Sequence, residues 1–259
     1  MPGFINITLS NQFLSKMLAV MAEEEKLGVT SGKPKKIVID YGGPNVAKPL
    51  HVGHLRSAII GESLKRIKRF MGDQVVGDIH LGDWGLQMGL IIEELRDRQP
   101  ELVYFKKGYT GEYPKEPPLT LSELEEIYPA ASAKSKEDEE FNERAHRAIL
   151  RIQNLDPAYM ALWQHIMSVS LPDLRRNYEN LNVSFDVWKG ESDVKPYINE
   201  MIDDLKERGV AYESQGALVV DIARDEDTKE LPPCIVRKSD GAAIYATSDL
   251  ATILDREKL

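Results

Sequence analysis

Cysteine and long apolar stretches are both scarce in this chain. A single cysteine, Cys234, stands among 259 residues, which excludes a disulfide framework and any cysteine-based zinc site. No apolar run approaches the roughly 18–20 residues that a membrane span needs, and the amino terminus lacks the basic and then apolar order of a secretory signal. These absences predict a soluble protein of the reducing cytoplasm with no membrane partner.

Positive charge is also in short supply. The formal net charge is −9, from 33 Lys and Arg against 42 Asp and Glu. This balance argues weakly against a general nucleic-acid coat, although a local basic face is still compatible with it, because steering depends on where charge lies. Repeats and low-complexity tracts are absent too, whereas 42% hydrophobic residues suffice for a substantial core in one or two domains.

The first regular pattern is a strand, a helix and a second strand. Residues 37–40 form a short apolar run typical of a strand buried on both faces, and residues 75–79 form a second such run. Between them, apolar spacing predicts a helix over about 53–71, stopped by Gly72. With the tight glycine-rich turn before the helix, this order predicts a parallel βαβ unit.

The remaining chain changes texture at about residue 100. A capping box of Ser122 and Glu125 predicts a short acidic helix, and two longer helices follow over about 141–152 and 159–169. Further patterns predict a helix over 194–205 ending at Gly209, a strand over 217–222, a hairpin of 234–238 with 242–247, and a last helix capped by Ser248. The basic cluster of Lys65, Arg66, Lys68 and Arg69 is interpreted as a solvated face, and Trp163 as core.

These elements define the predicted organisation. The fold class is α/β, an incomplete Rossmann-like parallel sheet with a mainly helical connective insertion. Residues 1–35 are interpreted as the end of an amino-terminal domain and a linker, 36–99 as the first half of the α/β domain, 100–189 as the insertion, and 190–259 as the return to the α/β domain.

Two histidines occupy the turn between the first strand and the first helix. His51 and His54 flank Gly53, and in an open parallel sheet ligands bind at the carboxyl ends of the strands. The amino end of a helix presents unpaired N–H groups and a partial positive charge of roughly +0.5, which favours phosphate. Gly53 leaves room for a flat base, so the turn suits a nucleoside triphosphate. The alternative is a pair of partly exposed histidines at a helix start. A metal site is a poorer interpretation, because no third and fourth ligands stand nearby at zinc spacing.

The residues around this turn carry a resemblance. Residues 40–57, DYGGPNVAKPLHVGHLRS, closely resemble the first signature of class I aminoacyl-tRNA synthetases, and within that class the arginyl enzymes. The likeness continues, in family order, in HLGDWGLQ at 80–87, GES at 190–192, VRKSDG at 236–241 and YATSDL at 245–250. Together these blocks are far more specific than the first signature alone.

The resemblance implies an ATP-dependent ligase. Arginine and ATP, the latter with Mg²⁺, would form arginyl-adenylate and pyrophosphate, and the arginyl group would pass to the 3′ end of tRNA(Arg) in a protein that acts as a monomer. By the family pattern His51, His54 and Lys48 carry the chemistry, and Pro44 and Gly53 join them in binding ATP. No resident metal and no tightly bound cofactor are expected. For Lys48 the alternative is a solvated loop lysine.

The resemblance also implies an arginine pocket. A guanidinium is a planar fork of five donors that stays charged, so a pocket for it requires facing carboxylates and acceptors. Glu191 and Asp249 match the family's guanidinium-binding acids, and Tyr245 its hydroxyl partner. Asp40 and Asn45 match positions that hold the α-amino and carboxylate ends. Without the resemblance, the two acids would be helix-start residues stabilised by the dipole.

The second block lies beyond the second strand. His80, Asp83, Trp84 and Gln87 are expected to line the floor between the adenylate and the tRNA end. The alternative is structural, with Trp84 as packing and Asp83 as a turn former. Gly42 and Gly43 stand where many relatives carry hydroxyl residues, and no role is assigned to them.

Family members extend further in both directions, so the chain is expected to be a fragment that is inactive alone. They continue into more strands, a lysine-rich KMSKS-type loop and an anticodon-binding domain, and they begin with an additional domain. Two rivals stay open. A nucleotidyltransferase shares the H-x-G-H motif without tRNA but lacks the Tyr245 and Asp249 block, and a non-catalytic paralogue would keep the fold as a binding module.

Overall fold

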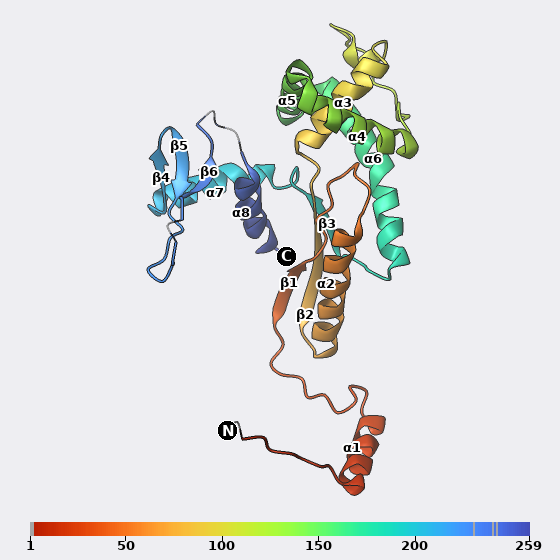
Figure 1. Cartoon of the computed structure of the whole chain (residues 1–259), viewed down its shortest axis with the longest axis vertical. Coiled ribbons are helices and arrows are strands. Elements are labelled where there is room, and N and C mark those ends of the chain that lie inside the picture. Colours follow the sequence, from red (N-terminus) through yellow and green to blue (C-terminus); the bar gives the residue numbers. More distant parts are fainter. Residues whose placement is uncertain (1–2, 230, 240, 242) are drawn as a thin grey trace.

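The computed structural model describes residues 3–229, 231–239, 241 and 243–259. Its helices are α1 (Asn11–Glu23), α2 (Val52–Phe70), α3 (Leu86–Arg98), η1 (Val103–Phe105), α4 (Leu121–Glu137), α5 (Glu139–Gln153), α6 (Pro157–Asn180), α7 (Lys195–Glu207) and α8 (Tyr245–Arg256). Its strands are β1 (Lys36–Asp40), β2 (Gln74–Leu81), β3 (Val187–Gly190), β4 (Ala211–Ser214), β5 (Ala217–Val220) and β6 (Cys234–Arg237). Figure 1 shows their arrangement.

A three-stranded parallel sheet forms the centre of the molecule. Its order is β1-β2-β3, with Asp40 opposite Asp78 and Leu81 opposite Gly190. All three strands therefore end at one edge of the sheet, the carboxyl edge. The predicted parallel βαβ unit and the α/β fold class are confirmed.

Helix α2 covers one face of this sheet. It begins one residue before the predicted start and ends at Phe70, with Met71 as its carboxyl cap. Gly72 follows with a φ of 97°, the left-handed conformation that a glycine adopts without strain. Gly61 lies so close to the ring of Tyr41 that a Cβ atom would collide with it. The backbone of α2 at Gly61 therefore packs directly against Tyr41 and holds the helix on the sheet.

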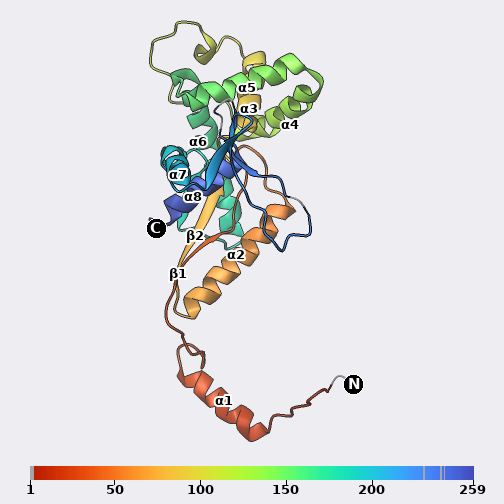
Figure 2. The same ribbon diagram turned by 90° about the vertical axis from the view of Figure 1, so that its left-hand side faces the viewer.

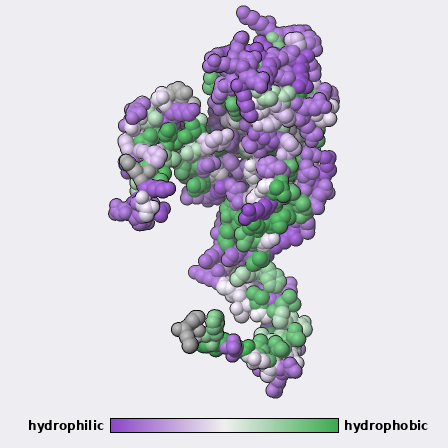
Figure 3. Space-filling model, viewed as in Figure 1, coloured by the Kyte–Doolittle hydropathy of each residue, from purple (hydrophilic) through white to green (hydrophobic). Residues whose placement is uncertain are grey.

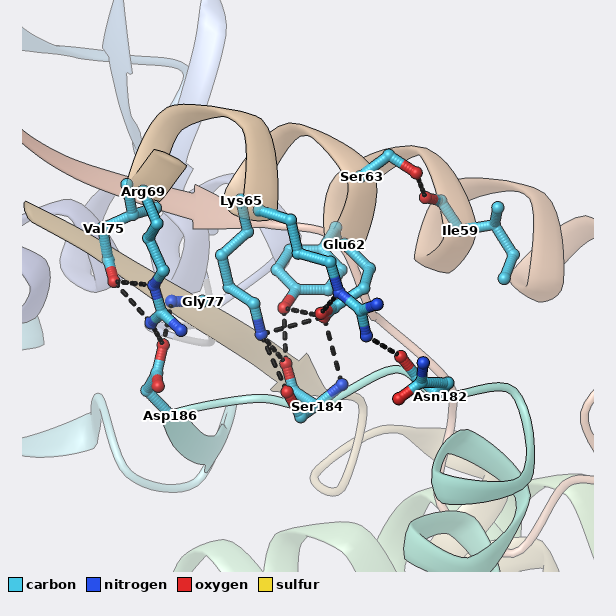
Figure 4. Close-up of polar contacts among 12 residues, drawn as sticks. Ile59, Glu62, Ser63, Lys65, Arg69, Val75, Gly77, Asn182, Ser184 and Asp186 are labelled. Atoms are coloured by element: carbon cyan, nitrogen blue, oxygen red, sulfur yellow. Dashed lines mark hydrogen bonds and ion pairs between the residues drawn. The ribbon is translucent and has the colours of Figure 1, made fainter. Parts of the chain in front are cut away.

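A buried polar network also holds α2 on the sheet (Figure 4). Lys65 is 1% exposed, and its ammonium group lies 2.8 Å from the Glu62 carboxylate and contacts Ser184. The hydroxyl of Tyr41 donates to Glu62 at 3.1 Å. Burial opposes ionisation of Glu62, but hydrogen bonds from Lys65 and Arg66 outweigh it and lower its pKa to about 2. The interpretation of the basic cluster as a solvated face was wrong for Lys65, because its amphipathic side chain crosses the α2–β2 interface.

The insertion helices α4, α5 and α6 pack with α3 in the part of the molecule at the top of Figure 1. Their shared apolar core includes Leu95, Ile127 and Leu162 and is continuous with Ile79 and Leu81 of the sheet. Helix α4 begins earlier than predicted. Thr120 accepts from the Glu123 N–H at 3.3 Å and Glu123 accepts from the Thr120 N–H at 2.7 Å, so the capping box stands two residues before the expected pair.

A second, antiparallel sheet follows with the order β4-β5-β6. The two-residue turn of Gln215 and Gly216 joins β4 to β5, and both residues have positive φ angles of 51° and 79°. The predicted hairpin of 234–238 with 242–247 was wrong. Strand β6 pairs with β5 instead, and the second half of the expected hairpin is helical from Tyr245. Asp240 of its predicted turn and Ala242 of its predicted second strand lie outside the described residues.

Helix α8 lies on the face of the parallel sheet opposite α2. Successive residues of a strand point to opposite faces. A side chain at Gly77 would meet Tyr41 and Lys65 on the α2 side, whereas Asp78 bonds to Arg256 of α8. Figure 2, which views the molecule from the side of α7 and α8, agrees by showing α8 in front of the sheet.

Apolar side chains gather on the surface of two elements. Helix α1 has no buried residue, and α2 exposes Ile59, Ile60, Leu64 and Ile67. Figure 3 shows this hydrophobic surface on the amino-terminal arm and on the adjoining part of the body. Among the described residues, no helix combines the length and apolar character needed to cross a membrane.

Candidate active site

The amino end of α2 holds its two histidines in defined orientations. The Gly53 N–H donates to His51 Nδ1 at 3.2 Å, and the His51 N–H donates to His54 Nδ1 at 3.2 Å. An Nδ1 atom that accepts a hydrogen bond carries no proton, so each neutral ring carries its proton on Nε2. The rings lie 3.9 Å apart between centroids. The turn therefore presents two Nε2–H donors beside the positive end of a helix, an arrangement that suits an anion.

Lys48 lies just before this turn. Burial, together with the neighbouring His51 and Lys48, lowers the pKa of His54, which disfavours the charged form of its ring. The Lys48 ammonium lies over the ring of Tyr128 in α4, 4.7 Å from its centroid. The insertion thus contacts the loop that carries the histidines, and the interpretation of Lys48 as a merely solvated lysine misses this partner.

The loop between β1 and α2 is tied to the end of β2. Val46 donates to the Gly82 carbonyl at 2.9 Å, and the Gly82 N–H donates to the Pro44 carbonyl at 3.1 Å. Asn45 stands between these two bonds, in a parallel bridge with Gly82. The half-buried Asn45 therefore lies at the carboxyl edge, between the histidine turn and the second sequence block.

Three carboxylates gather on the other side of the same edge. Glu191 directly follows β3, and burial together with the negative charges of Asp83 and Asp249 raises its pKa to about 7. Asp83 is buried and accepts from the N–H and the hydroxyl of Ser192 at 3.0 and 2.5 Å. A Cβ atom at Gly190 would collide with the Asp83 carboxylate, which explains the glycine at this position. A cation beside Glu191 would relieve the burial and the negative charges that raise its pKa.

A cleft of about 470 Å³ opens beside these acids. Its lining includes the side chains of Glu191, Tyr245, Ser248, Trp84 and Lys238. Tyr245 and Asp249 were expected on a strand and a helix, but both lie on α8, where residues four apart share a face. His51, His54 and Asp249 are not among the described residues that line this cleft.

The second block is held in place by the insertion and by its own backbone. The Gln87 amide donates to the Gly82 carbonyl at 2.8 Å, and the Trp163 indole N–H donates to the Asp83 carbonyl at 2.8 Å. Trp163 also meets Trp84 edge to face, with centroids 5.7 Å apart. Trp163 was assigned to the insertion core alone, so its link to the site was missed. A lone tryptophan in an amphipathic helix offers no sequence signal for such a bond.

His80 and Asp40 lie at the sheet itself. Both ring nitrogens of His80 are buried and have no hydrogen-bond partner within the described part of the chain. Asp40 ends β1 and is paired with Arg256, 2.6 Å from its guanidinium. The role of Asp40 toward substrate stays a prediction. Arg256 has no counterpart in the sequence analysis, because a lone arginine near the end of a helix is indistinguishable from a solvated one.

Metal ligands are not grouped in this site. Within the ranges that the structure describes, no three His, Cys, Asp or Glu side chains are arranged to hold a metal ion. The carboxyl edge therefore combines neutral donors for an anion at α2 with acids for a cation near α8. Such a pair of subsites matches a substrate pair of opposite charge.

Comparisons with known proteins show which family the chain resembles. The family model described as "tRNA synthetases class I (R), catalytic domain" matches residues 16–259. The arginine–tRNA ligase of Agathobacter rectalis is 61% identical over 259 residues, which cover 99% of this chain and 43% of the relative. That of Alkaliphilus oremlandii is 56% identical over 256 residues, covering 98% and 44%. The chain thus spans less than half the length of these relatives.

Solved structures resemble the chain as well. Arginyl-tRNA synthetase from Plasmodium falciparum has a TM-score of 0.71 at 25% identity, over 96% of this chain and 41% of that one. The Thermus thermophilus enzyme shares the fold, with a TM-score of 0.59 at 20% identity over 93% and 38%. With a family model matched over most of its residues, the chain belongs to the class I arginyl-tRNA synthetase catalytic-domain family.

Proposed function

We propose that the protein carrying this chain is an arginine–tRNA ligase of the cytoplasm and that this chain holds its ATP and arginine subsites. One observation carries the proposal: the same sheet edge has the hydrogen-bond donors of His51 and His54 on one side and the carboxylates of Glu191 and Asp249 on the other. ATP is a polyanion and arginine has a cationic side chain, so both substrates find complementary charge.

In the first step a carboxylate oxygen of arginine attacks the α-phosphorus of ATP. The bond from this phosphorus to the oxygen that bridges to the β-phosphate breaks, and pyrophosphate leaves. Negative charge shifts to oxygens that the Nε2–H groups of His51 and His54 would contact, with Gly53 leaving space for the adenine and Pro44 beside it. Preorganised donors of this kind stabilise charge that develops in the transition state.

Lys48 would supply a mobile charge. Its contact with Tyr128 is a cation–π contact at the protein surface, worth about 0.5–1 kcal/mol, so a phosphate oxygen competes with it easily. Mg²⁺ is expected to arrive bound to the ATP phosphates, since this ion commonly keeps its waters and takes few protein ligands. It would neutralise phosphate charge.

The guanidinium would lie between Glu191, Asp249 and the hydroxyl of Tyr245. Tyr245 is 71% exposed, so this hydroxyl is free to turn toward a ligand. Asn45 and Asp40 would hold the α-amino and carboxylate ends. In the second step a terminal ribose hydroxyl of tRNA(Arg) attacks the arginyl carbonyl carbon, and AMP leaves. His80, Asp83, Trp84 and Gln87 would form the floor under this transfer, in a protein that acts as a monomer.

The test is arginine-dependent exchange of pyrophosphate into ATP. It is run with tRNA present, in a protein that carries this chain at the full length of its relatives. Exchange that requires arginine supports the proposal, and Asp249→Asn is expected to reduce the preference for arginine over citrulline by about tenfold, which is about 1.4 kcal/mol. Exchange without any amino acid would favour a nucleotidyltransferase, and no exchange would favour a binding module.

A further inference from the structure

Two consecutive residues at the end of α8 contact all three strands of the parallel sheet. Asp255 pairs with Lys189 of β3 at 2.6 Å. Arg256 lies 2.8 Å from Asp78 of β2 and 2.6 Å from Asp40 of β1. Asp78 is 2% exposed and Asp255 is 5% exposed, so these pairs lie largely within the interface.

Apolar packing does not fix α8 on this sheet. Ala251 is the buried apolar residue of α8 among those described, and it belongs to the core formed by α7 and the β4-β5-β6 sheet. The parallel sheet belongs to a different core, which continues into the insertion. In the described chain the side-chain hydrogen bonds between α8 and the parallel sheet are therefore those of Asp255 and Arg256.

The direction of α8 relates these pairs to the arginine subsite. Asp255 lies beside Lys189, whereas Tyr245 and Ser248, earlier on α8, line the same cleft as Glu191, which follows Lys189 by two residues toward the carboxyl edge. The helix therefore runs against β3. Asp249 and Arg256 are seven residues apart, so they share a helix face and are separated by roughly 10 Å along the axis. A strand covers the same distance in about three residues. With Arg256 bound to Asp78, Asp249 therefore lies over the carboxyl edge.

We propose that Arg256 is a positioning residue for arginine: by bridging Asp40 and Asp78 it sets where Asp249 and Tyr245 of α8 lie relative to Glu191. The inference rests on the proposed function. A guanidinium suits this task because its planar fork bonds two carboxylates at once from one fixed position. Lysine carries a point charge on a flexible stem, so it retains the attraction and loses the fixed geometry.

The experiment compares Arg256→Gln and Arg256→Lys in the full-length context defined above. Arg256→Gln is expected to raise the KM for arginine about tenfold, because small misplacements of binding groups are costly, while the KM for ATP changes less than about twofold. Arg256→Lys is expected to raise the KM for arginine about threefold, since it retains the charge. The control is Arg208→Gln at the carboxyl cap of α7, an exposed arginine paired with Asp204 at 3.0 Å, which is expected to leave both constants unchanged.

The KM separates positioning from a merely structural role. A variant that folds poorly lowers the amount of active enzyme and hence the apparent kcat, but the remaining enzyme keeps its KM. An arginine KM equal to that of the wild type in both variants overturns the proposal, whatever happens to kcat. If Arg256→Gln does not fold, Arg256→Lys decides by the same criterion. Absence of arginine-dependent exchange in the wild type would refute the proposed function instead, so the two failures are distinct.

Discussion

Helices α2 and α8 lie on opposite faces of the same three strands, and they are held there in different ways. Helix α2 is seated by close packing of Gly61 on Tyr41 and by the buried contacts of Lys65 and Glu62. Helix α8 is attached through ion pairs of Asp255 and Arg256. The loop of residues 41–51 connects β1 directly to α2, whereas the antiparallel sheet precedes α8 in the chain.

The difference suits the two proposed substrates. The proposed donors for ATP phosphates stand on α2, which is held by close packing, and transition-state stabilisation demands fixed geometry. The proposed groups for the arginine side chain stand on α8, which is held by polar contacts. Changes on α2 should therefore alter the rate of chemistry or the stability of the fold, and changes on α8 should alter the affinity for arginine.

The histidines give the largest expected effect. His51→Ala and His54→Ala each remove one Nε2–H donor, and loss of such a donor typically lowers kcat by roughly 10²–10³-fold. The KM for arginine should change little, because these contacts strengthen only in the transition state. Pyrophosphate exchange kinetics measure both constants. A histidine variant that raised only the KM for arginine would contradict the assignment of chemistry to α2 and of arginine binding to α8.

Removal of the buried ammonium on α2 should cost stability. Lys65→Met leaves the Glu62 carboxylate with Arg66 as its remaining cation and leaves the Ser184 carbonyl with the Tyr41 hydroxyl as its remaining donor. Breaking a buried pair costs about 3–5 kcal/mol, and the lower figure is expected here because Arg66 remains. Urea unfolding of the chain measures the loss. Lys68→Met is the control, since Lys68 is half exposed and lies 3.7 Å from Asp73.

Unfolding at low pH should test the same polar network of Lys65 and Glu62. The folded pKa of Glu62 is about 2, below its ordinary value of 4.5, so its contribution to stability is present above about pH 4.5 and is lost as pH falls toward 2. In Lys65→Met this pKa rises, and the loss should begin at higher pH. Equal acid unfolding of Lys65→Met and the wild type would contradict the assigned contacts.

The smallest expected effect is a pH dependence on the α8 side. Glu191 has a pKa of about 7, raised by burial and by Asp83 and Asp249. A cationic side chain prefers its ionised form, so arginine affinity should rise about tenfold between pH 6 and 8 and level off above. The sign for stability is opposite: the contribution of Glu191 is present below about pH 4.5 and lost as pH rises through 7. Arginine KM measured against pH tests this, and Glu191→Gln should abolish the slope.

Much of the fold was predictable from short-range patterns. The apolar run at β1, the strand pattern at β2 and the helical spacing of α2 led to the parallel unit, because apolar runs are typical of parallel strands. The expectation that β1 is buried on both faces was wrong, since Ile37, Val38 and Ile39 are half-buried and both ends of the strand are exposed. The hairpin at 234–247 failed for the opposite reason. Residues 242–247 contain a short mixed run that suits strand or helix, and packing of Thr247, Ser248 and Ala251 selects the helix.

The sequence by itself determined the family and the βαβ unit and led to the prediction of the histidines, the acids and Tyr245 as site residues, because these are matters of residue type in a fixed order. Only the tertiary structure decided that Lys65 is buried, that Trp163 bonds to Asp83, and that Arg256 bridges two strands. Each of these contacts joins residues through space, and the energy of a charged group depends on its partner and its burial rather than on its neighbours in the chain.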